Sequence, residues 1–275
     1  MAEITAAMVK EFRNKTGLPM MECKKALMEA EGDQEKAIEI IRKAGKKTME
    51  KRSDRETEAG RIAIYKGANG VTAMVEVLCE SAPVTKNAEF IEMIEGMAKQ
   101  LAEGSGAATP EELMVQNFPG KDVSIQTVFD DMVNKIREVF RFTRLLRVEG
   151  NVGTYVHHDN AIGVVLEVEG DNIELADNIC MHIASMNPKA LCKEDLDPAM
   201  IAKEREIALE QTMNANAGKP QNIIDKIVDG RVKATIAEIC LADQPFVMES
   251  SKSVAQAAAD GGLKLKKMYH WKLGK

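Results

Sequence analysis

The chain has 275 residues, of which 45% are hydrophobic and 29% are charged, as is typical of a folded protein. Its formal net charge of −6 argues against a dedicated nucleic-acid binder, which usually carries a basic surface. No apolar run reaches the roughly 18 residues of a membrane span, and the first residues lack the apolar stretch of a signal peptide, so we expect a soluble, cytoplasmic protein without a membrane interaction.

Residues 1–46 are predicted to form three short helices. Apolar residues recur at helical spacing in each segment, and typical capping residues separate the segments: Gly17 after the first, Gly32 after the second and Asp33 before the third. Helices this short are marginal alone, so we expect them to pack together as a head. The charged stretch 47–59 is interpreted as a linker, or as a helix that is solvated on most sides.

Residues 60–147 are predicted to form a first core subdomain. Alternating apolar residues over 62–77, interrupted by a glycine-containing turn, predict a β-hairpin. A helix over 86–103 follows, and Thr109–Pro110 is typical of the start of another. A longer helix is predicted over 126–140.

The pattern of a hairpin followed by a helix recurs in residues 148–275, the predicted second core subdomain. Strands are expected at 148–156 and 161–169, with a helix over 173–185. The recurrence suggests that the two subdomains are related.

Two further features lie in the second subdomain. Residues 197–230 are predicted to form an antiparallel helical hairpin that projects as an arm, with its bend at 216–220. The tail 263–273 alternates enough to return as an edge strand. The predicted fold class is therefore α+β: a three-helix head, two related hairpin-plus-helix subdomains and a helical arm.

Few residues of the chain form a pattern typical of catalysis or metal binding. The five cysteines contain no C-x-x-C pair, which indicates reduced thiols. His157, His158 and Asp159, joined by His182, form the most tempting metal cluster, but adjacent histidines on an extended turn point to opposite sides. We interpret them as a polar turn. No phosphate-binding glycine motif occurs. We therefore expect that the chain binds no metal and no cofactor and is not an enzyme.

Motifs along the chain resemble those of the elongation factor Ts family. The family pattern L-R-x-x-T-G-x-x-x-M-D-C-K-K-A-L is highly specific, and residues 12–27 match it except for Phe12 in place of Leu and Glu22 in place of Asp. Further matches follow in order, so the resemblance spans nearly the whole chain. They are Met181–Ala184, Lys219–Pro220, Gly230–Arg231 and Gln244–Met248.

The resemblance implies a ubiquitin-associated-like head and a guanine-nucleotide exchange factor. Such a factor binds the GDP-bound translational GTPase elongation factor Tu and promotes release of GDP and Mg²⁺. It needs no cofactor of its own, because the nucleotide and Mg²⁺ belong to the partner. A role as a replicase subunit stays open, but the net negative charge of the chain disfavours direct RNA binding. The oligomeric state, including homodimerisation, stays open.

The resemblance also implies where the partner is contacted. Met20, Met21 and Lys24 lie on the head helix that contacts the GTPase domain in the family. Phe142 falls in a helix-to-strand region that meets the partner, and His157 lies in a hairpin turn that contacts another domain of the GTPase. In an alternative interpretation, Met20 and Cys23 point inward, into the head, and only Met21 and Lys24 are left for the partner.

One segment departs from the family pattern. Ser81, Ala82, Pro83 and Val84 stand where members usually carry Thr-Asp-Phe-Val, whose Phe wedges between GTPase helices and disturbs the Mg²⁺ site. Ala82 has no carboxylate, and Pro83 offers less apolar area than Phe but is a rigid wedge. We predict that exchange survives through backbone positioning and the other contacts. The alternative is a chaperone-like escort that binds elongation factor Tu with weak exchange.

Overall fold

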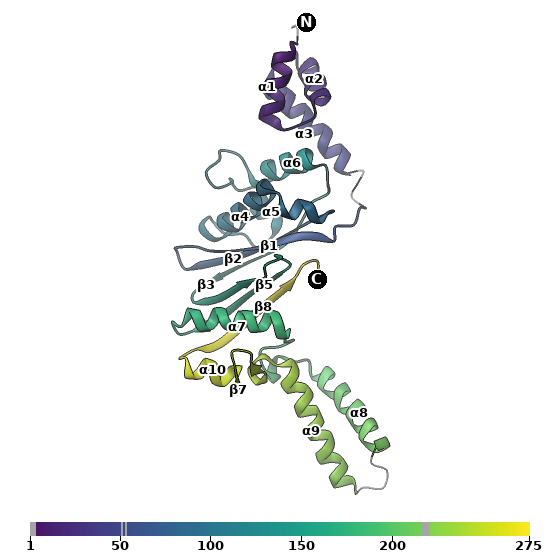
Figure 1. The fold of residues 1–275 in the computed structure, drawn as a ribbon, viewed down its shortest axis with the longest axis vertical. Helices are drawn as coiled ribbons and strands as arrows, with labels where there is room; N and C mark the ends of the chain where they lie inside the picture. The colour runs from purple at the N-terminus through teal and green to yellow at the C-terminus, as the bar shows by residue number, and fades with distance from the viewer. Residues whose placement is uncertain (1–3, 51, 53, 216–219) are drawn as a thin grey trace. The chain divides into compact units, whose positions relative to one another are not determined.

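The computed structural model describes residues 4–50, 52, 54–215 and 220–275 (Figure 1). The chain divides into two compact units. Both combine helices with antiparallel strands, which confirms the predicted α+β class. Unit 1 takes the described residues of Met1–Glu149, His158–Ala161 and Lys272–Lys275, and unit 2 takes those of Gly150–His157 and Ile162–Trp271.

Unit 1 begins with the three-helix head. Gly17, with a φ of 70°, ends the first helix, and the Asp33 carboxylate accepts backbone N–H groups at the start of the third, as predicted. The head has its own core, in which Phe12 and Leu27 are fully buried. The third helix continues into the charged stretch. The helices are α1 (Ala6–Thr16), α2 (Met20–Glu29) and α3 (Gln34–Glu50).

The rest of unit 1 is a three-stranded antiparallel sheet in the order β1-β2-β3, with α4 packed on one face (Figure 1). The central strand β2 is buried along its whole length. Phe90, Met97 and Leu101 of α4 are fully buried against the sheet. The elements are β1 (Ala59–Lys66), β2 (Val71–Cys79), η1 (Ala82–Lys86), α4 (Ala88–Glu103), α5 (Pro110–Met114), α6 (Ile125–Ile136) and β3 (Arg141–Glu149).

The strand β3 is absent from the sequence prediction, which extended a helix to residue 140. The helix α6 ends instead at Ile136, because Arg137 adopts a left-handed conformation with a φ of 67°. The register between β2 and β3 shifts between Glu76 and Val77, which leaves Thr143 as an extra residue. A bulge of this kind interrupts the two-residue alternation that identifies a strand.

The single strand predicted over 148–156 is also wrong. Its first residues end β3 in unit 1, and Val152–Val156 form a separate strand β4, which pairs with β5. Gly150 lies between them with a φ of 101°, a conformation that breaks a strand and that glycine adopts readily.

Unit 2 contains a second sheet in the order β4-β5-β8, and α7 packs on one of its faces (Figure 1). The predicted tail strand is β8, and it lies at the edge of this sheet, as expected. A short antiparallel pair, β6 and β7, precedes the last helix. The elements are β4 (Val152–Val156), β5 (Ile162–Glu169), α7 (Ile173–Met186), η2 (Lys193–Asp195), η3 (Leu241–Asp243), β6 (Pro245–Phe246), β7 (Glu249–Ser253), α10 (Val254–Asp260) and β8 (Lys264–Lys272).

The helical hairpin of unit 2 consists of α8 (Pro198–Ala215) and α9 (Gln221–Ile239), so its second helix continues past residue 230. The two helices share a small core that includes Ala208 and Val228. Most of the predicted bend, residues 216–219, lies outside the described residues. Within the part of the chain that the structure describes, no helix combines the length and the apolar character of a membrane span.

Candidate functional site

The segment Ser81–Val84 leaves the end of β2 and enters η1. Ala82 and Pro83 are exposed, Ser81 is half-buried, and only 8% of Val84 is exposed, since it packs in the core of unit 1. Two of the four predicted contact residues can therefore face a partner, whereas Val84 anchors the segment. We call the exposed pair Ala82 and Pro83 the tip.

The carboxylates of Glu138 and Glu80 fix the start of the segment through hydrogen bonds. The Ser81 backbone N–H donates to Glu138 Oε2 at 2.9 Å, and the Ser81 hydroxyl donates to Glu138 Oε1. In the opposite direction, the Val139 N–H donates to Glu80 Oε1 at 2.7 Å, and Arg55 Nη1 lies 2.9 Å from Glu80 Oε2. Burial alone would raise the pKa of the Glu80 carboxyl, but the Val139 amide and the Arg55 guanidinium bring it below its ordinary value. The residues just before the tip are thus fixed to the connection between α6 and β3.

The thiol of Cys79, next to this segment, is not a nucleophile. Burial raises its pKa to about 12, and the nearby Glu138 carboxylate acts in the same direction. The thiol stays protonated at neutral pH and lies 3.4 Å from the Ser81 carbonyl oxygen, to which it donates. Its place at the end of β2 is structural.

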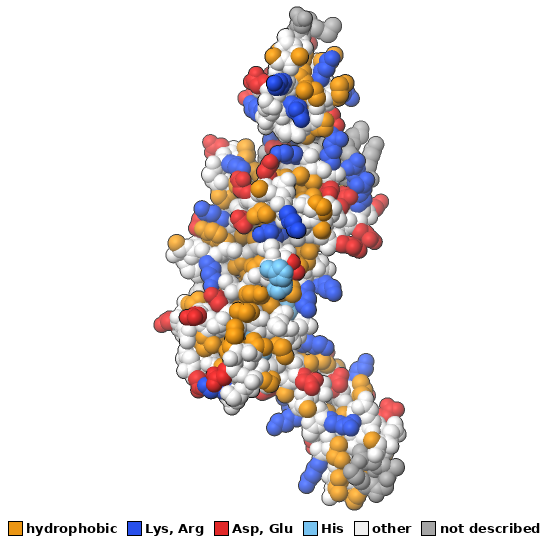
Figure 2. Space-filling view, viewed as in Figure 1, with side chains coloured by type: hydrophobic (Ala, Val, Ile, Leu, Met, Phe, Trp, Pro, Cys, Tyr) orange, Lys and Arg blue, Asp and Glu red, His pale blue; other side chains and the backbone are white. Residues whose placement is uncertain are grey.

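A second exposed surface lies on α2. Met20, Met21 and Met28 are 44%, 74% and 59% exposed, and Lys24 is exposed among them. We call the three methionines the methionine face. Met20 therefore does not point into the head as the alternative interpretation held, whereas Cys23 is fully buried. Figure 2 shows hydrophobic side chains beside Lys and Arg side chains on the surface of the head.

The sequence interpretation missed Met28, although a signal for it was present. It follows Met21 by seven residues, which is close to two helical turns and places both side chains on one face. The methionine face is also tied to the rest of unit 1, because Glu22 of α2 forms an ion pair with Arg137, the residue before Glu138. A short segment after α6, Arg137 and Glu138, therefore contacts both α2 and Ser81, the residue before the tip.

Phe142 and His157, the two remaining predicted contacts, are described in different units. Phe142 is half-buried on β3, pairs with Val77 of β2 and lies at the end of the sheet from which the tip emerges. His157 follows β4, is half-buried, and its Nδ1 lies 3.1 Å from the Tyr155 hydroxyl.

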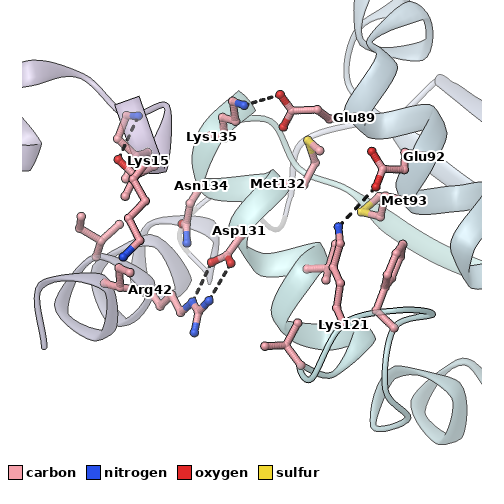
Figure 3. Close-up of a pocket in the computed structure, with 17 residues that line it drawn as sticks. Lys15, Arg42, Glu89, Glu92, Met93, Lys121, Asp131, Met132, Asn134 and Lys135 are labelled. Atoms are coloured by element: carbon pink, nitrogen blue, oxygen red, sulfur yellow. Dashed lines mark hydrogen bonds and ion pairs between the residues drawn. The ribbon is translucent and has the colours of Figure 1, made fainter. Parts of the chain in front are cut away.

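A cavity of about 460 Å³ lies within unit 1, between the head and the helices α4 and α6 (Figure 3). Leu18, Met93 and Met132 contribute apolar wall. Three ion pairs line it, of which one joins α3 to α6. We infer that these pairs serve packing within unit 1, and we assign no ligand to the cavity. The pairs are Arg42–Asp131, Glu92–Lys121 and Glu89–Lys135.

His182, the remaining member of the suspected metal cluster, is fully buried on α7 and has a structural environment. The Val247 N–H donates to its Nδ1 at 3.3 Å, so Nε2 carries the proton and donates to Gln244 Oε1 at 2.9 Å. Burial lowers the pKa of His182, with the hydrogen bond to Gln244 acting in the opposite direction. Among the described residues, no group of three or more His, Cys, Asp or Glu side chains is arranged to hold a metal.

Comparison with known proteins adds a family-level result. The model of the protein family described as Elongation factor TS matches residues 83–275. Elongation factor Ts of Thioalkalivibrio sulfidiphilus is 38% identical over 275 residues, which cover 98% of this chain and 92% of the relative. The same protein of Clostridium acetobutylicum is 37% identical over 265 residues, covering 93% and 86%. That of Aeromonas hydrophila is 38% identical over 257 residues, with the same coverage of 93% and 86%.

Proposed function

This chain belongs to the elongation factor Ts family of translation elongation factors, and we propose that it acts as a guanine-nucleotide exchange factor for the GTPase elongation factor Tu. In this role it binds the GDP-bound GTPase and promotes release of GDP and Mg²⁺. The tip and the methionine face are the main contacts, with Lys24, Phe142 and His157 contributing.

The observation that carries the proposal is the exposed tip on a fixed support. Pro83 has a restricted φ, Val84 is anchored in the core, and Ser81 is held by Glu138. A segment ordered before binding loses little conformational entropy when it inserts into a partner. A small apolar wedge can therefore displace elements around the partner's Mg²⁺ even without an aromatic ring.

Exchange of this kind requires binding energy and no covalent chemistry. A protein that binds the nucleotide-free GTPase more tightly than the GDP-bound form weakens GDP binding by the same factor. A preference of about 3 kcal/mol corresponds to roughly a 150-fold weakening. The polarizable, unbranched side chains of the methionine face suit a surface that must bind more than one state of a partner.

The experiment that tests this function is release of labelled GDP. Elongation factor Tu loaded with fluorescent GDP is mixed with the chain, and the release rate is measured against chain concentration. We expect a saturable acceleration that Pro83→Gly lowers, because the substitution removes both the apolar ring and the fixed φ. Pro245→Gly, at an exposed proline of unit 2, is the matched control and should leave the rate unchanged.

A second function has one observation in its favour. No aromatic side chain lies between Ser81 and Lys86, so the wedge is smaller than in the family pattern. An escort that holds elongation factor Tu without exchange would bind the GDP-bound and nucleotide-free forms equally well. Titration of both forms decides between the two functions, since equal affinities would refute exchange on thermodynamic grounds.

A further inference from the structure

The carboxylate of Glu138 is directed at Ser81 by the way α6 ends. Arg137 terminates α6 in the left-handed conformation, and β3 begins at Arg141, so Glu138 lies in a tight connection beside the end of β2. It is half-buried, and both of its oxygens accept hydrogen bonds from one residue, Ser81. A carboxylate bound at two points fixes both the peptide plane and the hydroxyl rotamer of its donor.

The two carboxylates at this place have different environments. Glu80 is paired with the guanidinium of Arg55, in addition to the Val139 amide. The Glu138 oxygens accept from Ser81 at the point where the chain leaves the sheet for the tip. The Glu138 side chain contacts Ser81, the residue that precedes the tip, whereas the Glu80 side chain contacts Val139 and Arg55. Glu138 therefore controls the tip more directly than Glu80 does.

This geometry changes the role of Ser81. The sequence interpretation counted it among the partner contacts, but its hydroxyl faces Glu138. Ser81 thus belongs to the support, and Ala82 and Pro83 are left as the exposed residues of the segment.

We propose that Glu138 is a positioning residue for nucleotide exchange, which acts by holding Ser81 and so setting the direction in which Ala82 and Pro83 leave the sheet. The inference rests on the proposed exchange function. It predicts that the loss of the Glu138 carboxylate disorders the tip while the methionine face keeps its exposed side chains. The maximal rate of GDP release should then fall more than the apparent affinity.

The test begins with the chain alone. Hydrogen–deuterium exchange of residues 81–86 should accelerate in Glu138→Ala, because the Ser81 N–H loses its acceptor. Glu149→Ala, which removes an exposed carboxylate from the end of β3, is the matched control for charge and should leave these amides unchanged. Unchanged exchange of residues 81–86 in Glu138→Ala would overturn the proposal whatever the activity of the chain.

The second arm uses GDP release from elongation factor Tu. Glu138→Ala should lower the maximal rate about tenfold, the effect expected from losing a charge-assisted hydrogen bond. Glu138→Gln keeps one acceptor oxygen and should recover part of the rate. Ser81→Ala removes only the hydroxyl, so it tests the same contact with less risk to folding.

A double substitution separates positioning from a general loss of structure. If Glu138 acts through the tip, Glu138→Ala should have almost no further effect in a Pro83→Gly chain. Fully additive losses would overturn the proposal and leave Glu138 as a residue that only stabilises the fold. If the unsubstituted chain fails to accelerate GDP release, the exchange function itself fails, and hydrogen–deuterium exchange still shows whether Glu138 orders the segment.

Discussion

The strand β4 approaches α7 so closely at Gly153 that there is no room for a side chain. A Cβ placed on Gly153 would lie 2.4 Å from both the backbone carbon and the backbone oxygen of Ala176, and 2.8 Å from its Cβ. Ordinary contacts of a Cβ are 3.4–4 Å. The substitution Gly153→Ala therefore requires α7 and β4 to separate by about 1 Å, across the core that includes Ile179 and Ile183.

The expected loss of stability is at the upper end for overpacking. Extra methyl groups in a packed core typically cost about 1–3 kcal/mol, and here the blocking atoms are helix backbone, which cannot rotate away. With a urea dependence of roughly 2 kcal/mol per M, a loss of about 3 kcal/mol lowers the unfolding midpoint by about 1.5 M. Trp271, the only tryptophan of the chain, belongs to unit 2 and reports its unfolding by fluorescence.

The matched control is Gly230→Ala in the interior of α9. A Cβ there meets no atom within 4 Å, so the substitution should stabilise the helix by up to about 1 kcal/mol through helix propensity. Far-ultraviolet circular dichroism follows both variants. A midpoint for Gly153→Ala within about 0.2 M of the unsubstituted chain would refute the reasoning, because it would mean that α7 yields without strain.

Two further predictions concern single residues. Arg137 adopts a φ of 67°, a backbone conformation that costs a residue with a Cβ about 1 kcal/mol or more. Arg137→Gly should therefore raise the free energy of unfolding, measured by urea denaturation, by about 1 kcal/mol, although it removes the exposed ion pair with Glu22. A decrease would show that the ion pair outweighs the strain. Burial lowers the pKa of His182 below its ordinary value of 6.5, so the unfolded chain binds a proton more readily than the folded one, and the stability present above pH 6.5 should decline as the pH falls toward the folded-state pKa. His182→Gln should lose less stability than the unsubstituted chain between pH 7.5 and pH 5.5, and parallel losses would contradict the assignment.

Features fixed by neighbours in sequence could be predicted. Gly17, Asp33 and Thr109 are all found at the helix ends where the sequence placed them, because a capping bond joins residues only a few positions apart. The α+β class followed from the change of apolar spacing at residue 60, which is also a local property.

The support of the tip could not be predicted in the same way. Glu138 and Ser81 lie 57 positions apart in the sequence, and no periodicity links them. The strand β3 escaped recognition because its bulge and its several arginines disturb the alternation, and because the left-handed residue that ends α6 is an arginine where glycine is usual. The contact residues of a site can thus be recognised from a motif, whereas the residues that hold them depend on the tertiary fold.

The segment after α6 connects the two exposed surfaces of unit 1. Arg137 pairs with Glu22 on the helix of the methionine face, and Glu138 holds Ser81 below the tip. Substitutions at these two neighbouring positions should therefore differ in their effects on stability and on the protection of the Ser81 amide. Arg137→Gly relieves backbone strain and leaves the Ser81 amide protected, whereas Glu138→Ala relieves no strain and exposes that amide to exchange. If nucleotide exchange requires the tip and the methionine face to engage one partner together, Arg137→Gly should weaken binding of elongation factor Tu although the chain itself is more stable. The reason is that the substitution frees α2 from the segment that supports the tip.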